Sequence, residues 1–343
     1  MRGVRLLPGQ EISLTLAKRR SIQFSGGHQV RTPLLLPSFS SKGFPDLQKI
    51  FDVMQEHISE EILVSAYDVG EKLLKQDFDF ASLLYLDSGG YESSKDLDLS
   101  DTREDNYQKR SWSLEKYQAV LADWNTTSPT VFVSYDGPET RLPYAEQIAL
   151  ARSLSIPKGR NAKALLLKPP TESGIRHDLK TLIPACRLMD DMPVIGVTEK
   201  EIGNGILNRM LNIARLRRAL DRLYDDRPIH VFGSLDTIST YLYFLAGADI
   251  FDGLTWLRYA FHDGDTIYRH THGLLLDLPL TTNSDIVEAN SWVSNYRYTR
   301  VMLIKMSKFL ADGNFEHFGR RSAIIRDAFE TMNAELAGDE NGR

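Results

Sequence analysis

Residues 130–169 read TVFVSYDGPETRLPYAEQIALARSLSIPKGRNAKALLLKP and contain two apolar runs on either side of an amphipathic segment. Each run is short, rich in β-type residues and followed by a polar or turn residue, which is typical of a strand buried on both faces. The segment between them, PYAEQIALARSL, carries apolar residues at helical spacing with charges on the other side. This stretch therefore predicts a strand, a helix and a second strand.

The same alternation extends in both directions along the chain. Eight such runs occur, at Thr32–Ser40, Glu61–Tyr67, Leu83–Gly90, Thr130–Gly137, Lys163–Pro169, Pro193–Thr198, Pro228–Ser234 and Ala248–Gly253. Eight strands that alternate with helices predict an α/β fold, a (β/α)8 TIM barrel. A doubly wound open sheet is the structural alternative.

We expect four segments along the chain. They are an N-terminal lead-in over 1–30, the barrel over 31–284, a helical basic C-terminal extension over 285–337, and a frayed tail over 338–343.

The overall composition excludes several classes of protein. The chain has 343 residues, of which 42% are hydrophobic and 25% charged, and it contains no apolar run long enough to cross a membrane. Its formal net charge of -5 argues against a protein whose whole surface binds nucleic acid, although a local basic patch stays open. Cys186 is the single cysteine, which excludes an internal disulfide and a multi-cysteine zinc site. The N-terminus lacks the apolar character of a signal peptide, so we expect a cytoplasmic protein.

Polar residues follow most of the predicted strands. In a TIM barrel the C-terminal strand ends meet at one mouth, where catalytic groups lie. The polar residues expected there are Ser65, Tyr67, Asp87, Asp136, Lys168, Thr198, Ser234 and Asp252. Any one aspartate is explained equally well as an N-cap of the next helix. Three carboxylates at one mouth, two of them beside glycine, favour a functional site.

The motif Asp87-Ser88-Gly89-Gly90-Tyr91 follows the third run. Its two glycines let the backbone approach a planar ligand closely, and the tyrosine could stack on a base. An ordinary turn explains the motif almost as well.

Taken in order, these motifs resemble those of the tRNA-guanine transglycosylase family. DSGGY resembles the family's Asp-Ser-Gly-Gly-Phe. GADIFDGLTWLRYAFHDG at 247–264 resembles the family's later block that begins Gly-x-Asp-x-Phe-Asp. EILVSAYDVG, VSYDGP, PVIGVTEKE and PIHVFGSLD resemble further segments in the family's order. The resemblance implies a (β/α)8 barrel that exchanges a guanine in a polynucleotide for a 7-deazaguanine, the chemistry of queuosine-type modification, through a covalent aspartyl–sugar intermediate.

The resemblance also implies roles for individual residues. Asp252 matches the nucleophile, and Asp87 matches the general acid/base. The implied base-binding residues are Ser88, Gly89, Gly90, Tyr91, Asp136, Lys168, Gly196, Val197 and Thr198. Ser65, Tyr67 and Arg258 match positions near the ribose. The implied partners are a nucleic acid, tRNA or DNA, and a free purine or 7-deazaguanine base, with no cofactor, no metal and no membrane; a homo-oligomer stays open because family members often dimerise.

Two departures from the family pattern affect these expectations. Lys168 stands where the family has glutamine, and because lysine only donates hydrogen bonds, the choice of base is expected to differ. No cysteine follows Cys186, so the family's zinc subdomain must be missing or rebuilt. We interpret His270 and His272 as surface or core residues, not as zinc ligands.

The C-terminal region contains a basic segment. Residues 295–326 hold seven Lys and Arg against two Asp and Glu, a local net charge of +5, with aromatic residues between them. The predicted contacts to a nucleic-acid backbone are Arg297, Arg300, Lys305, Lys308, Arg320 and Arg321. A pair of amphipathic helices with solvated cations is an equal alternative.

Two other functions compete with guanine exchange. An N-glycosidase would use water in place of the incoming base. A non-catalytic partner subunit is disfavoured, because degenerate partners usually lose the catalytic carboxylates and this chain keeps Asp87 and Asp252.

Overall fold

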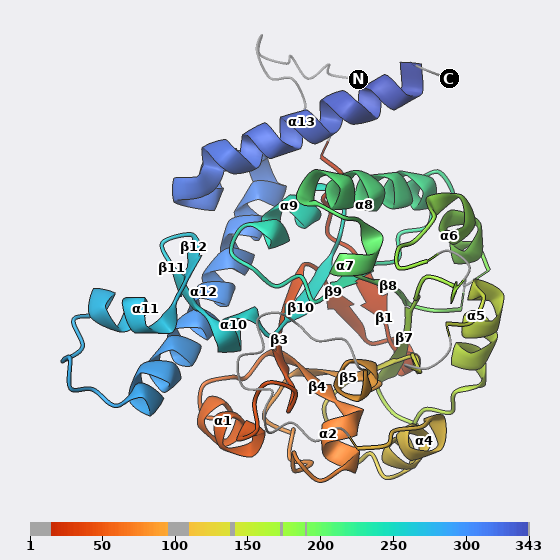
Figure 1. The fold of residues 1–343 in the computed structure, drawn as a ribbon. Helices are drawn as coiled ribbons and strands as arrows, with labels where there is room; N and C mark the ends of the chain where they lie inside the picture. The colour runs from red at the N-terminus through yellow and green to blue at the C-terminus, as the bar shows by residue number, and fades with distance from the viewer. Residues whose placement is uncertain (1–14, 95–109, 138–140, 172–173, 189–190, 342–343) are drawn as a thin grey trace.

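Eight parallel strands form a closed barrel at the centre of the molecule (Figure 1). The computed structural model describes residues 15–94, 110–137, 141–171, 174–188 and 191–341. The barrel strands are β3 (Leu34–Phe39), β4 (Glu61–Ser65), β5 (Leu83–Asp87), β6 (Thr130–Val133), β7 (Asn161–Leu166), β8 (Val194–Thr198), β9 (Ile229–Phe232) and β10 (Ile250–Gly253). Each predicted apolar run overlaps one of them, so the TIM barrel is confirmed and the open sheet is wrong.

The barrel closes between its first and last strands. Chain neighbours are also sheet neighbours from β3 to β10, and β10 then pairs with β3 so that Ile250 lies opposite Leu34. Every one of these eight strands therefore has a partner on both sides, which satisfies the backbone groups of the ring.

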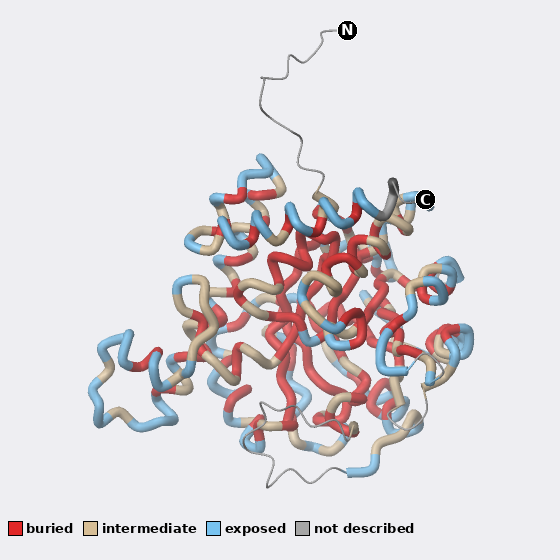
Figure 2. Tube along the Cα trace, turned by 45° about the horizontal axis from the view of Figure 1, so that its top comes forward, coloured by how far each residue is buried: buried red, intermediate tan, exposed pale blue. Residues whose placement is uncertain are grey.

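Helices surround the barrel on its outer side, where Figure 2 shows buried segments beneath exposed helix faces. The helices of this ring are α1 (Leu47–Met54), α2 (Ala66–Gly70), α4 (Leu114–Ala122), α5 (Tyr144–Ser153), α6 (Leu179–Cys186), α8 (Ile206–Asp221) and α9 (Ser239–Leu245). Three short helices instead follow strand ends at the mouth: α3 (Gly90–Ser93), α7 (Glu199–Ile202) and α10 (Thr255–Arg258). Alternate strand residues separate into two apolar clusters. Leu34 and Leu36 belong to the cluster that fills the barrel, whereas Leu35 packs with the helices.

An N-terminal hairpin closes the end of the barrel opposite the mouth. It consists of β1 (Ser21–Gln23), the short 3-10 helix η1 (Ser25–Gly27) and β2 (Gln29–Arg31), and Ile22 belongs to the interior apolar cluster. The buried Arg20 binds Asp249 Oδ1 at 3.0 Å, and the buried Arg217 of α8 binds Asp249 Oδ2 at 3.0 Å. A buried ionic cluster therefore joins the hairpin, α8 and the start of β10.

The C-terminal extension packs along one side of the barrel. It contains β11 (Ala260–His262), β12 (Asp265–Ile267), α11 (Arg269–Leu275), α12 (Ser284–Asp312), the 3-10 segment η4 (Phe315–Arg321) and α13 (Ser322–Asn341). In Figure 1, α13 crosses over α8 and α9, while α11 and the start of α12 project from the barrel. The helical extension is thus confirmed, and α13 continues into the segment that we expected to fray. No helix in the part of the chain that the structure describes is long and apolar enough to cross a membrane.

Candidate active site at the barrel mouth

Three hydrogen-bond donors hold the Asp252 side chain at the end of β10. Ser38 of β3 donates from Oγ to Oδ2 at 2.9 Å. His230 Nε2 lies 3.0 Å from Oδ1, and the Gly233 N–H donates to the same oxygen at 3.1 Å. The carboxylate is buried, so these contacts fix its orientation at the mouth.

His230 of β9 is hydrogen-bonded to this carboxylate. Burial lowers the pKa of His230 below its usual value, although the hydrogen bond to Asp252 opposes this shift. Because a carboxylate only accepts hydrogen bonds, the ring proton lies on Nε2. The ring stacks on Phe232 with centroids 3.6 Å apart. Sequence reasoning missed this residue as part of the site; the one signal was a polar residue inside the apolar run PIHVFGS.

Asp87 occupies a very different environment at the end of β5. Burial raises the pKa of Asp87 well above its usual value, and the nearby carboxylates of Asp136 and Glu92 raise it further. The Gly89 N–H donates to Asp87 Oδ2 at 3.2 Å and acts in the opposite direction. A carboxyl group with a raised pKa can carry a proton near neutral pH, as a general acid must.

The two glycines of the DSGGY motif bring Asp136 and the β5 turn together. Gly89 has φ +90°, in the region that side chains rarely adopt. A Cβ on Gly90 would lie 2.2 Å from Asp136 Oδ1, so only glycine allows this approach. Ser88 is buried and donates from Oγ to the same oxygen. The motif therefore positions the Asp136 carboxylate beside Asp87.

Lys168 lies between two carboxylates at the next part of the mouth. Its Nζ is 3.4 Å from Asp136 Oδ2 and 3.4 Å from Glu201 Oε2. Burial lowers the pKa of Lys168, but these two carboxylates outweigh it, and the pKa lies above its usual value. Glu201 also accepts from Thr198 and Arg141. Lys168 is thus a fixed cation beside the candidate base-reading aspartate, and Glu201 is a further site residue that the sequence did not reveal.

A second group of buried carboxyl groups, Glu92 and Asp68, lies close to Asp87. Glu92 accepts hydrogen bonds from Ser40 and Ser65, and burial raises its pKa. Asp68 accepts from the Ser41 N–H at 3.0 Å, and burial together with Glu92 raises its pKa well above the usual value. The Ser65 hydroxyl, expected near the ribose, is therefore hydrogen-bonded to the Glu92 carboxylate. Sequence reasoning also missed this group, because nothing in the pattern brings 40–41 next to 68 and 92.

Tyr91 lies at the rim of the mouth and is partly exposed. Its hydroxyl accepts from Arg258 Nη2 at 3.0 Å. Lys42 Nζ lies 4.4 Å from the ring centroid and 3.0 Å from the Tyr91 carbonyl oxygen. The ring is therefore oriented by two cations, one of which covers a face.

Three other predicted site residues, Tyr67, Gly196 and Val197, are buried in the packing around the mouth. Tyr67 is fully buried beside Trp112 and lies under the DSGGY turn, where a Cβ on Gly89 would be 2.7 Å from Tyr67 Cβ. Val197 packs its side chain into the outer apolar cluster, so it offers only backbone groups to the mouth. Gly196 allows Phe232 to approach, because a Cβ there would lie 2.7 Å from that ring.

Four of the six predicted phosphate-binding cations contact other groups of the protein. Arg300 binds Glu61 at 2.6 Å, Arg320 binds Asp263 at 3.0 Å, and Arg321 pairs with Asp265. Lys305 Nζ lies 3.3 Å from the Phe318 carbonyl oxygen. The aromatic residues between the cations are largely core residues: Tyr296, Phe309, Phe315 and Phe318 are buried.

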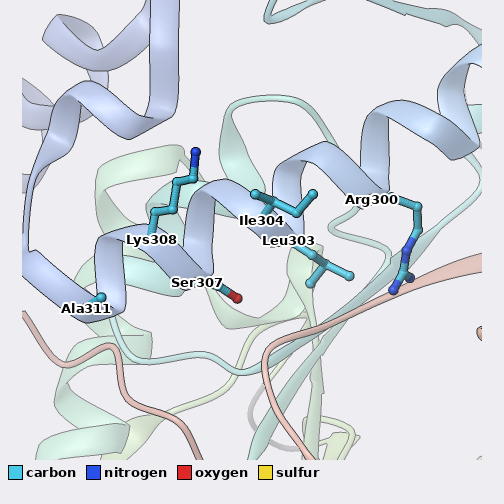
Figure 3. A pocket seen from close by; sticks show the side chains of 6 residues that line it. All are labelled: Arg300, Leu303, Ile304, Ser307, Lys308 and Ala311. Carbon is cyan, nitrogen blue, oxygen red and sulfur yellow. The ribbon is translucent and has the colours of Figure 1, made fainter.

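Arg297 and Lys308 are exposed on α12 and form no ion pair with the described residues. Lys308 lies in a shallow depression with Arg300, Leu303, Ile304, Ser307 and Ala311, as Figure 3 shows. Among the described residues, these two cations are therefore the exposed members of the predicted set that form no ion pair.

His270 and His272, which form a His-x-His sequence, have different environments. His272 is buried, with Nδ1 3.3 Å from Ser291 Oγ, and His270 is exposed. His272 is therefore a core residue and His270 a surface residue. Across 15–94, 110–137, 141–171, 174–188 and 191–341, no group of three or more His, Cys, Asp or Glu side chains could hold a metal ion.

Neither a protein-family model nor a curated protein matches this sequence. The resemblance to transglycosylases therefore depends on the short motifs and on the residues that the barrel mouth brings together.

Proposed function

We propose that this chain is a cytoplasmic guanine transglycosylase, which exchanges a guanine in tRNA or DNA for a free 7-deazaguanine base. The observation that carries the proposal is the contrast between two aspartates at one mouth. Asp252 is held as a hydrogen-bond acceptor by three donors, whereas burial and neighbouring carboxylates raise the pKa of Asp87. A pair of carboxyl groups in such different environments suits a nucleophile and a general acid/base.

The reaction then follows as two displacements at C1′ of the nucleotide. In the first, an Asp252 oxygen bonds to C1′, the bond from C1′ to the guanine nitrogen breaks, and Asp87 gives its proton to the departing base. In the second, Asp87 takes a proton from the incoming base, whose nitrogen bonds to C1′ as the bond to Asp252 breaks. Two inversions retain the configuration at the sugar.

Asp136 and Lys168 are proposed to recognise the base. They present an acceptor and a donor next to each other, 3.4 Å apart. A guanine-type edge places N–H groups beside a carbonyl oxygen, which complements such a pair. The target nucleotide must be unpaired or flipped out for C1′ to reach Asp252, and Tyr91 at the rim is placed to contact an extruded base.

An exchange assay tests the proposal. The protein is incubated with radiolabelled guanine and one polymer in each of three separate reactions. The polymers are bulk tRNA, duplex DNA and single-stranded DNA. We expect one polymer to become labelled and a protein–nucleic-acid adduct to survive denaturation. Both should disappear in Asp252→Ala, while Asp263→Ala, at an exposed position in the turn between β11 and β12, serves as the matched control.

Each other outcome identifies a competing function. A polymer that loses guanine without gaining label would indicate an N-glycosidase. A wild-type protein that binds the polymer but gives neither label nor adduct would indicate a non-catalytic subunit. An adduct that persists in Asp252→Ala would place the nucleophile elsewhere.

A further inference from the structure

The two oxygens of Asp252 have unequal sets of donors. Oδ1 accepts from His230 Nε2 at 3.0 Å and from the Gly233 N–H at 3.1 Å. Among the residues described, Oδ2 accepts from Ser38 Oγ alone, at 2.9 Å, and a hydroxyl can rotate away. Oδ2 is therefore the oxygen better placed to bond to C1′, and Oδ1 would then become the carbonyl oxygen of the resulting ester.

We infer that His230 is a positioning residue that holds Oδ1 through both displacements and so promotes release of the sugar from Asp252. This inference rests on the proposed function, because it concerns the second half of that reaction. It assigns His230 a role that is separate from base recognition and from proton transfer.

The physical reason is the difference between an ester and a carboxylate as hydrogen-bond acceptors. When the incoming base attacks C1′, the bond from C1′ to Oδ2 breaks and its electron pair returns to the carboxylate. A hydrogen bond to an ionised acceptor is about twice as strong as one to a neutral acceptor. The His230 N–H therefore stabilises the released carboxylate more than the ester. The proton of the incoming base passes to Asp87, and His230 keeps its own proton.

The surroundings of His230 fit this role better than a packing role. The ring is fully buried, stacked on Phe232 and contacted edge-on by Tyr85. Its Nδ1 has no hydrogen-bond partner in the described part of the chain, and a buried nitrogen without a partner lowers stability. An apolar side chain would fill the position without that cost. The hydrogen bond to Asp252 is therefore what the imidazole contributes.

Three variants separate this role from a structural one. His230→Leu removes the donor, and His230→Gln keeps an N–H within reach of Oδ1. Tyr85→Phe is the matched control, because its buried hydroxyl has no partner within the described residues and its ring touches His230. End-labelled tRNA, or DNA if that polymer takes up guanine, is mixed with excess enzyme, and adduct formation is followed by rapid quench. Excess 7-deazaguanine then displaces the sugar, which gives the release rate separately.

We expect His230→Leu to form the adduct and to release it roughly tenfold more slowly. His230→Gln should recover most of the release rate, and Tyr85→Phe should match the wild type. Unchanged release in His230→Leu, or equal slowing of formation and release, would overturn the inference. If His230→Leu does not fold, His230→Asn, whose amide is too short to reach Oδ1, takes its place. A wild type that forms no adduct would instead refute the proposed function.

Discussion

Replacing Asp249 by asparagine should strongly destabilise the barrel while leaving the mouth chemistry of the folded protein intact. Asp249 is 1% exposed and lies between Arg20 and Arg217, both of which are fully buried. Its Oδ2 also accepts from the Ile229 N–H at 2.8 Å. An asparagine keeps one acceptor oxygen but turns its amide N–H groups towards a donor, so one guanidinium loses its partner.

The expected loss in the free energy of unfolding follows from these contacts. Removing one partner of a buried ion pair costs about 3–5 kcal/mol, because the other charge stays buried without compensation. Asp221 remains 3.6 Å from Arg20 and 3.9 Å from Arg217, so part of the charge is still balanced. We therefore expect a loss near the lower limit, about 3 kcal/mol, out of a total stability that is typically about 5–15 kcal/mol.

Urea unfolding of Asp249→Asn and of a matched surface variant measures this effect. In the Arg320–Asp263 pair the side chains are 60% and 61% exposed, so Asp263→Asn should cost less than about 1 kcal/mol. A loss for Asp249→Asn no larger than that for Asp263→Asn would refute the reasoning. Folded Asp249→Asn should still form the covalent adduct, because Asp249 lies at the end of the barrel opposite Asp252.

Three further variants test the electrostatics of the mouth and of α12. Burial raises the pKa of Asp68 in the folded protein, so the stability that its protonated form contributes is present below the usual carboxyl pKa and is lost as the pH rises. Asp68→Asn should therefore melt at a higher temperature than the wild type at pH 8, and this advantage should shrink towards pH 4. The Glu92 carboxylate helps to raise the pKa of Asp87, so Glu92→Gln should move the alkaline fall in exchange rate to lower pH. Replacing Arg297 and Lys308 by glutamine should reduce the salt slope of polynucleotide binding by about 1.4 to 1.8, the value for two phosphate contacts.

Controls and contrary outcomes follow from the same contacts. Arg320→Gln removes a cation that is already paired with Asp263, so it should change the salt slope less than the α12 double variant. An unchanged slope in the double variant would mean that nucleic acid docks elsewhere. A melting advantage of Asp68→Asn that does not depend on pH would exclude a buried charge as its cause.

The strands and the three mouth aspartates could be predicted from sequence because topology alone determines them. A strand buried on both faces is a continuous apolar run, as in 34–39 and 83–87, and its C-terminal end must reach the mouth. Asp87, Asp136 and Asp252 therefore followed once the barrel was recognised. The hairpin at 21–31 was not predicted, because its strands are only three residues long and have little apolar character.

The supporting residues could not be predicted, because they depend on contacts between distant segments. His230 reaches Asp252 from the neighbouring strand, and Glu92 meets Ser40 only when β3, β4 and β5 lie side by side in the sheet. The basic segment shows the same limit. Tyr296 and Phe309 count as aromatic neighbours of cations in the sequence, but packing of α12 on the barrel and η4 turns them into core residues.

The pairing of β3 with β10 also has a consequence during synthesis on the ribosome. Leu34 and its partner Ile250 are separated by 216 positions (250 minus 34). At about 5–20 residues per second, the ribosome needs roughly 10–40 s to make that stretch. During this interval the apolar strand LLLPSF has an open edge that can pair with other nascent chains. A chain that stops before residue 250 keeps that edge permanently, so truncated products of this gene should aggregate and be degraded while the full-length chain folds.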